Sequence, residues 1–189
     1  MKLALTSMLL LETAALAAPI TLPARWEYAA KFVCGAQMSP TSGPPSEPPV
    51  KMGNYATVIN IHNPAAKTVT LQKKVALAAP ETYPQTTLID PTKRFADKLT
   101  SDHTMSVDCR EIVNLLTQNG TPPVGSFIEG FLVVDAYLST TGANTAAVLD
   151  VTAVTTTSNT STAGTPAQVT SHRVVTVPGR SLRAGTWPF

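Results

Sequence analysis

The chain has few charged, aromatic and cysteine residues, and each shortage argues against a class of protein. Asp, Glu, Lys and Arg make up 14% of the 189 residues, against roughly 25% in an average globular protein. The net charge is +2 and the basic residues are scattered, which argues against a nucleic-acid-binding surface. Aromatic residues make up 6%, with Trp26 and Trp187 near the chain ends. No platform of aromatic rings for sugars is therefore evident.

Catalytic signatures are also missing from the sequence. It contains no nucleophile elbow, phosphate-binding loop, dinucleotide fingerprint or metalloprotease motif. The two cysteines lack the close C-x2-C spacing that is typical of zinc sites, and no calcium-loop spacing is found. We therefore expect no cofactor and no metal, and we favour a protein that is not an enzyme.

The first residues, MKLALTSMLLLETAALAAP, have the pattern of a secretory signal peptide. Lys2 supplies the basic start, Leu3–Leu11 the apolar stretch, and Ala15–Ala17 the small residues of a cleavage site. Glu12 interrupts the apolar run, which is too short to span a bilayer. A buried N-terminal helix or a retained anchor is the alternative. We predict that residues 1–17 are a signal peptide and that the protein is secreted, to the periplasm or outside the cell, with no membrane span after cleavage.

Most of the remaining chain alternates apolar and polar residues with the period of β-strands. In Tyr28–Cys34, for example, every second residue from Tyr28 is expected to face the interior. The sequence NIHNPAAK between two such stretches predicts a hairpin. SFIEGFLVVDAYLS is apolar on both faces, which favours a central strand. About seven strands are predicted, within YAAKFVC, NYATVINIH, TVTLQKKVALA, MSVDC, SFIEGFLVVDAYLS, AAVLDVTAVTTTS and TSHRVVTV.

One short helix is predicted after the fourth strand. Asp108 stands three residues before Glu111, the spacing of a capping box with Asp as the cap. Ile112, Leu115 and Leu116 follow with helical apolar spacing, and Asn119-Gly120 marks the end of the helix.

These elements predict an all-β fold, an antiparallel immunoglobulin-like β-sandwich of about seven strands with one short helix. A jelly roll or another two-sheet topology is the alternative. We place the domain at residues 26–178 and assign residues 179–189 to a C-terminal tail.

The cysteines, Cys34 and Cys109, are expected to form a disulfide. Both lie on the inward phase of a strand pattern, and export places them in an oxidising compartment. Cys34 lies too far after the signal peptide for a lipid anchor, and no recognisable signature marks it as a catalytic thiol. A disulfide that closes the loop between Cys34 and Cys109 would stabilise the fold by roughly 4 kcal/mol in the chain-entropy model.

Asn60, His62 and Asn63 are the candidate ligand-binding residues, because Asn60 and His62 share a strand face and Asn63 lies at its end. The competing interpretation is a hydrogen-bonded strand end beside an Asn-Pro turn. Lys73 and Lys74 are interpreted as a solvated strand edge that discourages pairing.

The segments YAAKFVCG, GNYATVINIHNP, KKVALA and VDCREI, followed by GFLVV and LDVTAV, resemble a group of uncharacterised, secreted bacterial single-domain β-sandwich proteins. The resemblance covers roughly Tyr28–Val177 and is most specific in KFVCG and NIHNP. It implies an exported β-sandwich with both cysteines placed as here, and no established activity.

We predict a secreted, non-catalytic binding or adhesion module, or an envelope-associated structural module. The expected partner is a protein or a cell surface. Self-association is expected at exposed strands, first of all the threonine-rich strand near residue 150. The alternative is a carbohydrate- or metal-binding protein, or an enzyme, with its site on the loops.

Overall fold

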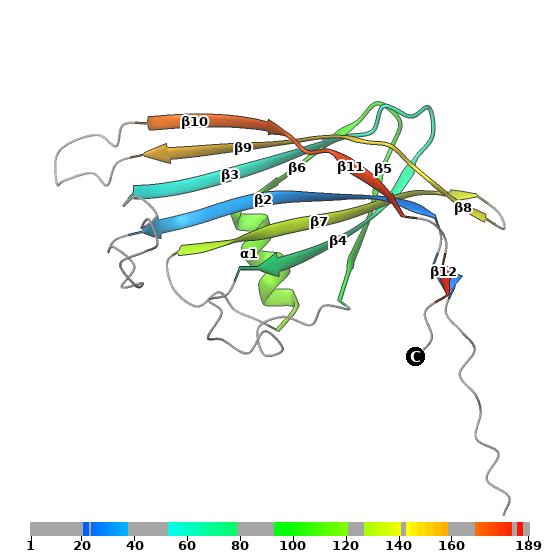
Figure 1. Ribbon diagram of the computed structural model, residues 1–189, viewed down its shortest axis with the longest axis horizontal. Coiled ribbons are helices and arrows are strands. Elements are labelled where there is room, and N and C mark those ends of the chain that lie inside the picture. The colour runs from blue at the N-terminus through cyan, green and yellow to red at the C-terminus, as the bar shows by residue number, and fades with distance from the viewer. Residues whose placement is uncertain are drawn as a thin grey trace, which may run out of the picture.

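A computed structural model describes residues 21–22, 24–37, 53–78, 93–120, 127–140, 143–158, 169–182 and 185–186. Twelve strands and one helix lie in these ranges (Figure 1). The predicted signal peptide lies outside them. The elements are β1 (Thr21–Leu22), β2 (Arg25–Gln37), β3 (Gly53–His62), β4 (Val69–Leu77), β5 (Phe95–Leu99), β6 (Thr104–Asp108), α1 (Cys109–Gln118), β7 (Phe127–Thr140), β8 (Ala143–Ala146), β9 (Asp150–Ser158), β10 (Val169–Thr176), β11 (Gly179–Leu182) and β12 (Gly185–Thr186).

Ten of these strands form one open antiparallel sheet, which confirms the all-β class with one short helix. Its main path runs β10-β9-β3-β2-β7-β4-β5, with β6, β8 and β11 attached at its sides. The sheet has more strands than the seven expected, because short strands such as β5 and β8 show little alternation. Hydrogen bonding connects all ten strands, so the described chain does not divide into the two separate sheets of an immunoglobulin-like sandwich.

The sheet forks between β2 and β3. These strands pair only where Gly35–Gln37 meets Gly53–Tyr55. Beyond that point β6 pairs with β3 from Val58 to His62, along the edge that β2 has left. The other edge of β3 is paired with β9 throughout. The two halves of the sheet therefore diverge from the fork and enclose a shared core.

The core lies on the inward face of the sheet, beneath α1. Alternation in β2 is confirmed, since Tyr28, Ala30, Phe32 and Cys34 are buried while Ala29 and Lys31 are exposed. Helix α1 contributes Ile112, Leu115 and Leu116 to the same cluster. In Figure 1 this helix lies behind the strands, so the opposite sheet face is turned towards the viewer.

The predicted cap of α1 is also confirmed. The side chain of Asp108 accepts a hydrogen bond from the backbone N–H of Glu111 at 2.9 Å. At the other end Asn119 is the C-cap, and Gly120 has φ of 82°, a left-handed conformation that glycine adopts without strain. The cap fixes where β6 ends and the helix begins, and it thereby places Cys109 in the first turn of α1.

Three sequence expectations about connectivity have different outcomes. The position of β7 is central as expected, between β2 and β4. The hairpin expected across NIHNPAAK is wrong, because β3 and β4 do not pair and β4 lies between β7 and β5. Residues 179–182, which were assigned to the tail, form β11 and pair with the start of β2. Gly179 permits this contact, because a Cβ there would lie 2.5 Å from the ring of Tyr28.

Candidate functional site

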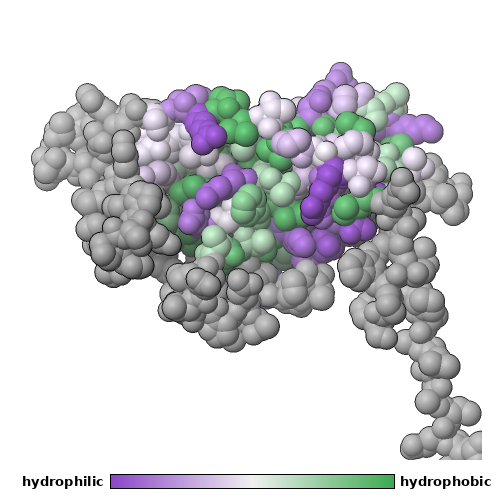
Figure 2. Space-filling view, in the orientation of Figure 1, coloured by the Kyte–Doolittle hydropathy of each residue, from purple (hydrophilic) through white to green (hydrophobic). Residues whose placement is uncertain are grey.

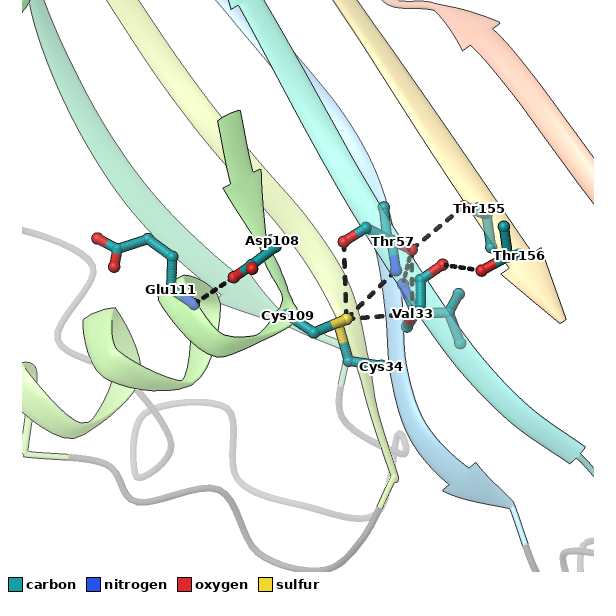
Figure 3. The surroundings of a disulfide bond; sticks show 9 residues. Val33, Cys34, Thr57, Asp108, Cys109, Glu111, Thr155 and Thr156 are labelled. Atoms are coloured by element: carbon teal, nitrogen blue, oxygen red, sulfur yellow. Dashed lines mark hydrogen bonds between the residues drawn. A yellow bond between two sulfur atoms is a disulfide. The ribbon is translucent and has the colours of Figure 1, made fainter. Parts of the chain in front are cut away.

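The predicted disulfide is present and lies at the fork of the sheet (Figure 3). It joins Cys34 on β2 to Cys109, the first residue of α1, with Cα atoms 5.7 Å apart and a sequence separation of 75. Thr57 on β3 lies beside the bond, and its N–H donates to Cys109 Sγ at 3.2 Å. The disulfide therefore ties β2, β3 and α1 together where the sheet divides.

Thr57 also replaces the backbone ladder where β2 and β3 separate. Its hydroxyl oxygen lies 3.0 Å from both the N–H and the carbonyl oxygen of Val33, accepting from the first and donating to the second. The side chain is almost fully buried, at 1% exposure. A hydroxyl can act as both donor and acceptor, so one buried threonine provides a hydrogen-bond partner for two backbone groups of β2. This region is structural.

Asn63, one of the three candidate ligand-binding residues, is a buried structural residue in this fold. Its side-chain amide donates to the carbonyl oxygens of Lys67, Leu99 and Thr100 at 2.9–3.0 Å. Its side-chain oxygen accepts from the N–H of Ala65. These bonds use the amide's hydrogen-bonding capacity and turn the chain away from β3, which explains why no hairpin forms there.

His62 is held between two carboxylates. Its Nδ1 lies 3.0 Å from Asp150 Oδ2 and its Nε2 lies 3.2 Å from Asp102 Oδ1. Hydrogen bonding to Asp150, and then to Asp102, raises the pKa of His62 above its ordinary value. Asp102 adopts a left-handed backbone with φ of 55°. The three side chains are at least one-third exposed, and they link the ends of β3 and β9 to the turn before β6.

The third candidate, Asn60, lies two residues earlier on the same outward face. Its side-chain oxygen accepts from the hydroxyl of Ser106 on β6 at 2.7 Å. Sequence reasoning therefore placed Asn60 and His62 on one face correctly, while the fold directs Asn63 inward. Within the described ranges, no group of three or more His, Cys, Asp and Glu side chains is arranged to hold a metal ion.

Lys73 was interpreted as solvated, and the structure contradicts this. It is 4% exposed, on the inward face of β4 between Leu71 and Val75. Its ammonium group lies 2.7 Å from the carboxylate of Asp97 on β5 and 4.0 Å from the sulfur of Met105 on β6. The alternation of Val69, Leu71 and Val75 predicts inward placement of residue 73, since every second residue of a strand shares a face.

A cavity of about 420 Å³ opens beside this ion pair, where β4, β5, β6 and the first turn of α1 meet. Lys73, Asp97 and Met105 line it, together with Ser106, Asp108, Arg110 and Glu111. Its volume is within the range of small-molecule sites, and its charges include both signs. Lys73 and Asp97 neutralise each other, and Asp108 caps the helix, so most of these groups have structural partners.

A second buried charge lies on the outward face of β7. Asp135 is 1% exposed and its Oδ2 lies 3.2 Å from Arg25 Nε and 2.9 Å from Arg94 Nη1. Burial raises the pKa of Asp135, and the two arginines partly oppose this. Beside it on β2, Glu27 is paired with Arg180 of β11. This charge network fastens β11 and the residues before β5 to the centre of the sheet.

The two ends of the sheet differ in how they present their outer edges. At one end is β5, which has five residues, including Asp97 and Lys98. At the other is β10, which has eight residues, of which only Arg173 has a permanent charge. Side chains from Ser171 to Thr176 are all exposed. Within the described part of the chain, β10 pairs with β9 alone, so one side of its backbone has no partner strand.

The sheet face next to this edge carries a row of valines. Val58, Val154 and Val174 are cross-strand neighbours on β3, β9 and β10. Val58 is 36% exposed and Val174 is 58% exposed. Small polar residues flank the row, among them Thr152 and Thr156. Figure 2 shows that hydrophobic residues on the visible face are interspersed with hydrophilic ones. The residues around β10 are therefore compatible with pairing to another strand.

Comparison of the chain with protein-family models, curated proteins and solved structures finds no match. No helix within the described ranges is long and apolar enough to cross a membrane. The structural feature that stands out is the edge formed by β10, and its sequence signal is the single permanent charge in VTSHRVVT.

Proposed function

We propose that this protein is a secreted, non-catalytic binding module that recognises an extended segment of another polypeptide at the free edge of β10. The observation that carries the proposal is the edge itself, an eight-residue strand at the end of the sheet with exposed side chains and one permanent charge. Unpaired backbone N–H and C=O groups along such an edge form a template for an added strand. A signal-like N-terminus and the disulfide support export.

The rest of the fold is suited to holding this edge in place. The disulfide, Thr57 and the buried charge network all lie within or beside β2, β3 and β7. Strand β9 pairs with β3 over nine residues and with β10 along the opposite side. An added strand would therefore extend a rigid sheet, and little ordering of the binding surface would be needed.

A peptide test addresses the proposal directly. The probe is a labelled peptide with the sequence of residues 169–177, which can pair with an edge strand through its backbone. We expect saturable binding to the protein, and loss of binding when alternate peptide nitrogens are methylated, because methylation removes the donors of one strand edge. Binding that is unchanged by methylation would contradict strand addition.

The matched protein variants are Val174→Lys and Val148→Lys. The two valines have similar exposure, 58% and 53%, but Val148 precedes β9 and lies off the free edge. A lysine on an edge strand opposes further pairing. We expect Val174→Lys to weaken peptide binding at least about tenfold, a change of about 1.4 kcal/mol, and Val148→Lys to leave it unchanged. Equal effects of both variants would refute the proposed site.

A further inference from the structure

We infer that the strand added at β10 belongs to a second copy of this protein, with the two β10 strands antiparallel about a twofold axis through Val174. This inference rests on the proposed function and names the partner. A twofold axis perpendicular to the sheet keeps outward side chains on the outward face. The sequence numbers of two residues that face each other across the axis must then differ by an even number. This leaves only a few possible registers for the pairing.

The side chains of β10 select among these registers. An axis at Arg173 would oppose two arginines, and like charges directly across a strand pair are destabilising. An axis at His172 would oppose two imidazoles. An axis at Val174 sets Val174 of one copy opposite Val174 of the other; this is the most exposed large hydrophobic residue of the described chain. It also sets Arg173 opposite Val175. It therefore places an apolar pair on the axis and keeps the only permanent charges of the strand from lying directly opposite each other.

This register also extends a pattern that already exists within one protomer. The row Val58, Val154 and Val174 crosses three strands on the outward face. About the proposed axis it would continue through the same three valines of the second copy. A row of β-branched side chains across six strands gains cross-strand packing at each step. Val175, which is 39% exposed, ends a second apolar row with Ala153 and Ile59, but those two residues are buried, so that row lies on the inward face of the sheet.

Opposed cysteines in antiparallel strands lie within disulfide range when their Cα atoms are about 5.5 Å apart. We therefore test three single variants, Val174→Cys, His172→Cys and Val148→Cys, by mild oxidation and electrophoresis without reductant. We expect a covalent dimer from Val174→Cys only. Crosslinking of His172→Cys in preference to Val174→Cys would overturn the register. Dimer yields from Val174→Cys that do not exceed those of Val148→Cys would overturn the second copy as partner.

Sedimentation of the unmodified protein supplies an independent readout. We expect a monomer–dimer equilibrium that depends on concentration, and a shift to monomer in Val174→Lys with unchanged thermal stability. A monomer at every concentration up to about 100 μM, the upper part of the range for weak complexes, would overturn the inference. If the peptide still binds in that case, the proposed function stands with another polypeptide as partner. If the peptide also fails to bind, both the proposed function and the second copy as its partner are refuted.

Discussion

The two edge strands of the sheet, β5 and β10, differ in length, charge and exposure. The outermost strand at one end, β5, is short and charged; its neighbour β4 contacts α1, and the inward Lys73 of β4 is paired with Asp97. The β9–β10 end is long, nearly uncharged and exposed. Charge, short length and cover are the usual ways in which proteins prevent edge pairing. Within the described residues, one edge therefore has these protections and the other has no partner strand.

The comparison implies that stability and association depend on different regions of the sheet. Contacts near the fork and at β5 should determine the free energy of unfolding, whereas β10 should determine association. Substitutions at each region can separate the two properties, and they are given below in order of decreasing expected effect.

Replacement of both Cys34 and Cys109 by alanine should have the largest effect. The disulfide closes a loop of 75 residues, and its loss is expected to lower the free energy of unfolding by about 4 kcal/mol. Urea denaturation measures this change. Binding of the 169–177 peptide under folding conditions should be retained, because the bond lies at the fork. A loss of less than about 1 kcal/mol would show that the disulfide is not a principal restraint.

Asp97→Ala should have the next largest effect. It leaves the Lys73 ammonium, 4% exposed, without its carboxylate. Breaking a buried pair costs about 3–5 kcal/mol; because the Asp97 side chain is 39% exposed, we expect a loss nearer about 2 kcal/mol.

Lys73→Met is the matched variant for this ion pair. It removes the buried charge while keeping an apolar stem, and the exposed Asp97 can be solvated by water. We expect it to be less destabilising than Asp97→Ala in the same urea experiment. A larger loss for Lys73→Met would mean that packing of the lysine stem outweighs its charge.

Lys98→Val tests whether charge protects the β5 edge. Lys98 is exposed and lies opposite Thr70 of β4. Its replacement should change stability by less than about 0.5 kcal/mol, but it should promote additional association detected by light scattering. Lys67→Val is the control, since it removes the same charge from an exposed turn. Association in both variants to the same extent would indicate a general charge effect.

The smallest effect is expected from His62. Its pKa is raised in the folded protein by Asp150 and Asp102. The contacts of protonated His62 with these two carboxylates therefore stabilise the fold fully below the unfolded pKa of about 6.5. This contribution is lost as pH rises through the raised folded value. The groups are exposed, which keeps the effect small.

Thermal unfolding of His62→Gln and the unmodified protein from about pH 5.5 to about pH 8.5 tests this sign. The difference in Tm should shrink as pH rises. His103→Gln is the control, because the ring of His103 contacts the backbone carbonyl of Ser101. A difference that grows with pH would mean that the neutral ring is the form stabilised by the fold.

The sequence by itself determined the local elements and the cross-link. Alternation identified the inward face of β2, the capping spacing identified the start of α1, and the phase of Cys34 and Cys109 identified the disulfide. Each depends on residues close together in the chain or on a single available partner. The wrong expectations for Lys73 and for the hairpin at Asn63 have a common cause, because the partners of both residues lie on strands distant in sequence.

Only the tertiary structure decided how the strands are ordered and which edge remains open. Strand order depends on competition among pairings of similar local character, and alternation is the same for any of them. The fork arises because Thr57 and the disulfide replace the backbone ladder between β2 and β3. Strand β10 lies at the end of the sheet because, in the described part of the chain, it pairs with β9 alone. The sequence of β10 shows a strand with little charge, and its position in the sheet makes that strand an available edge.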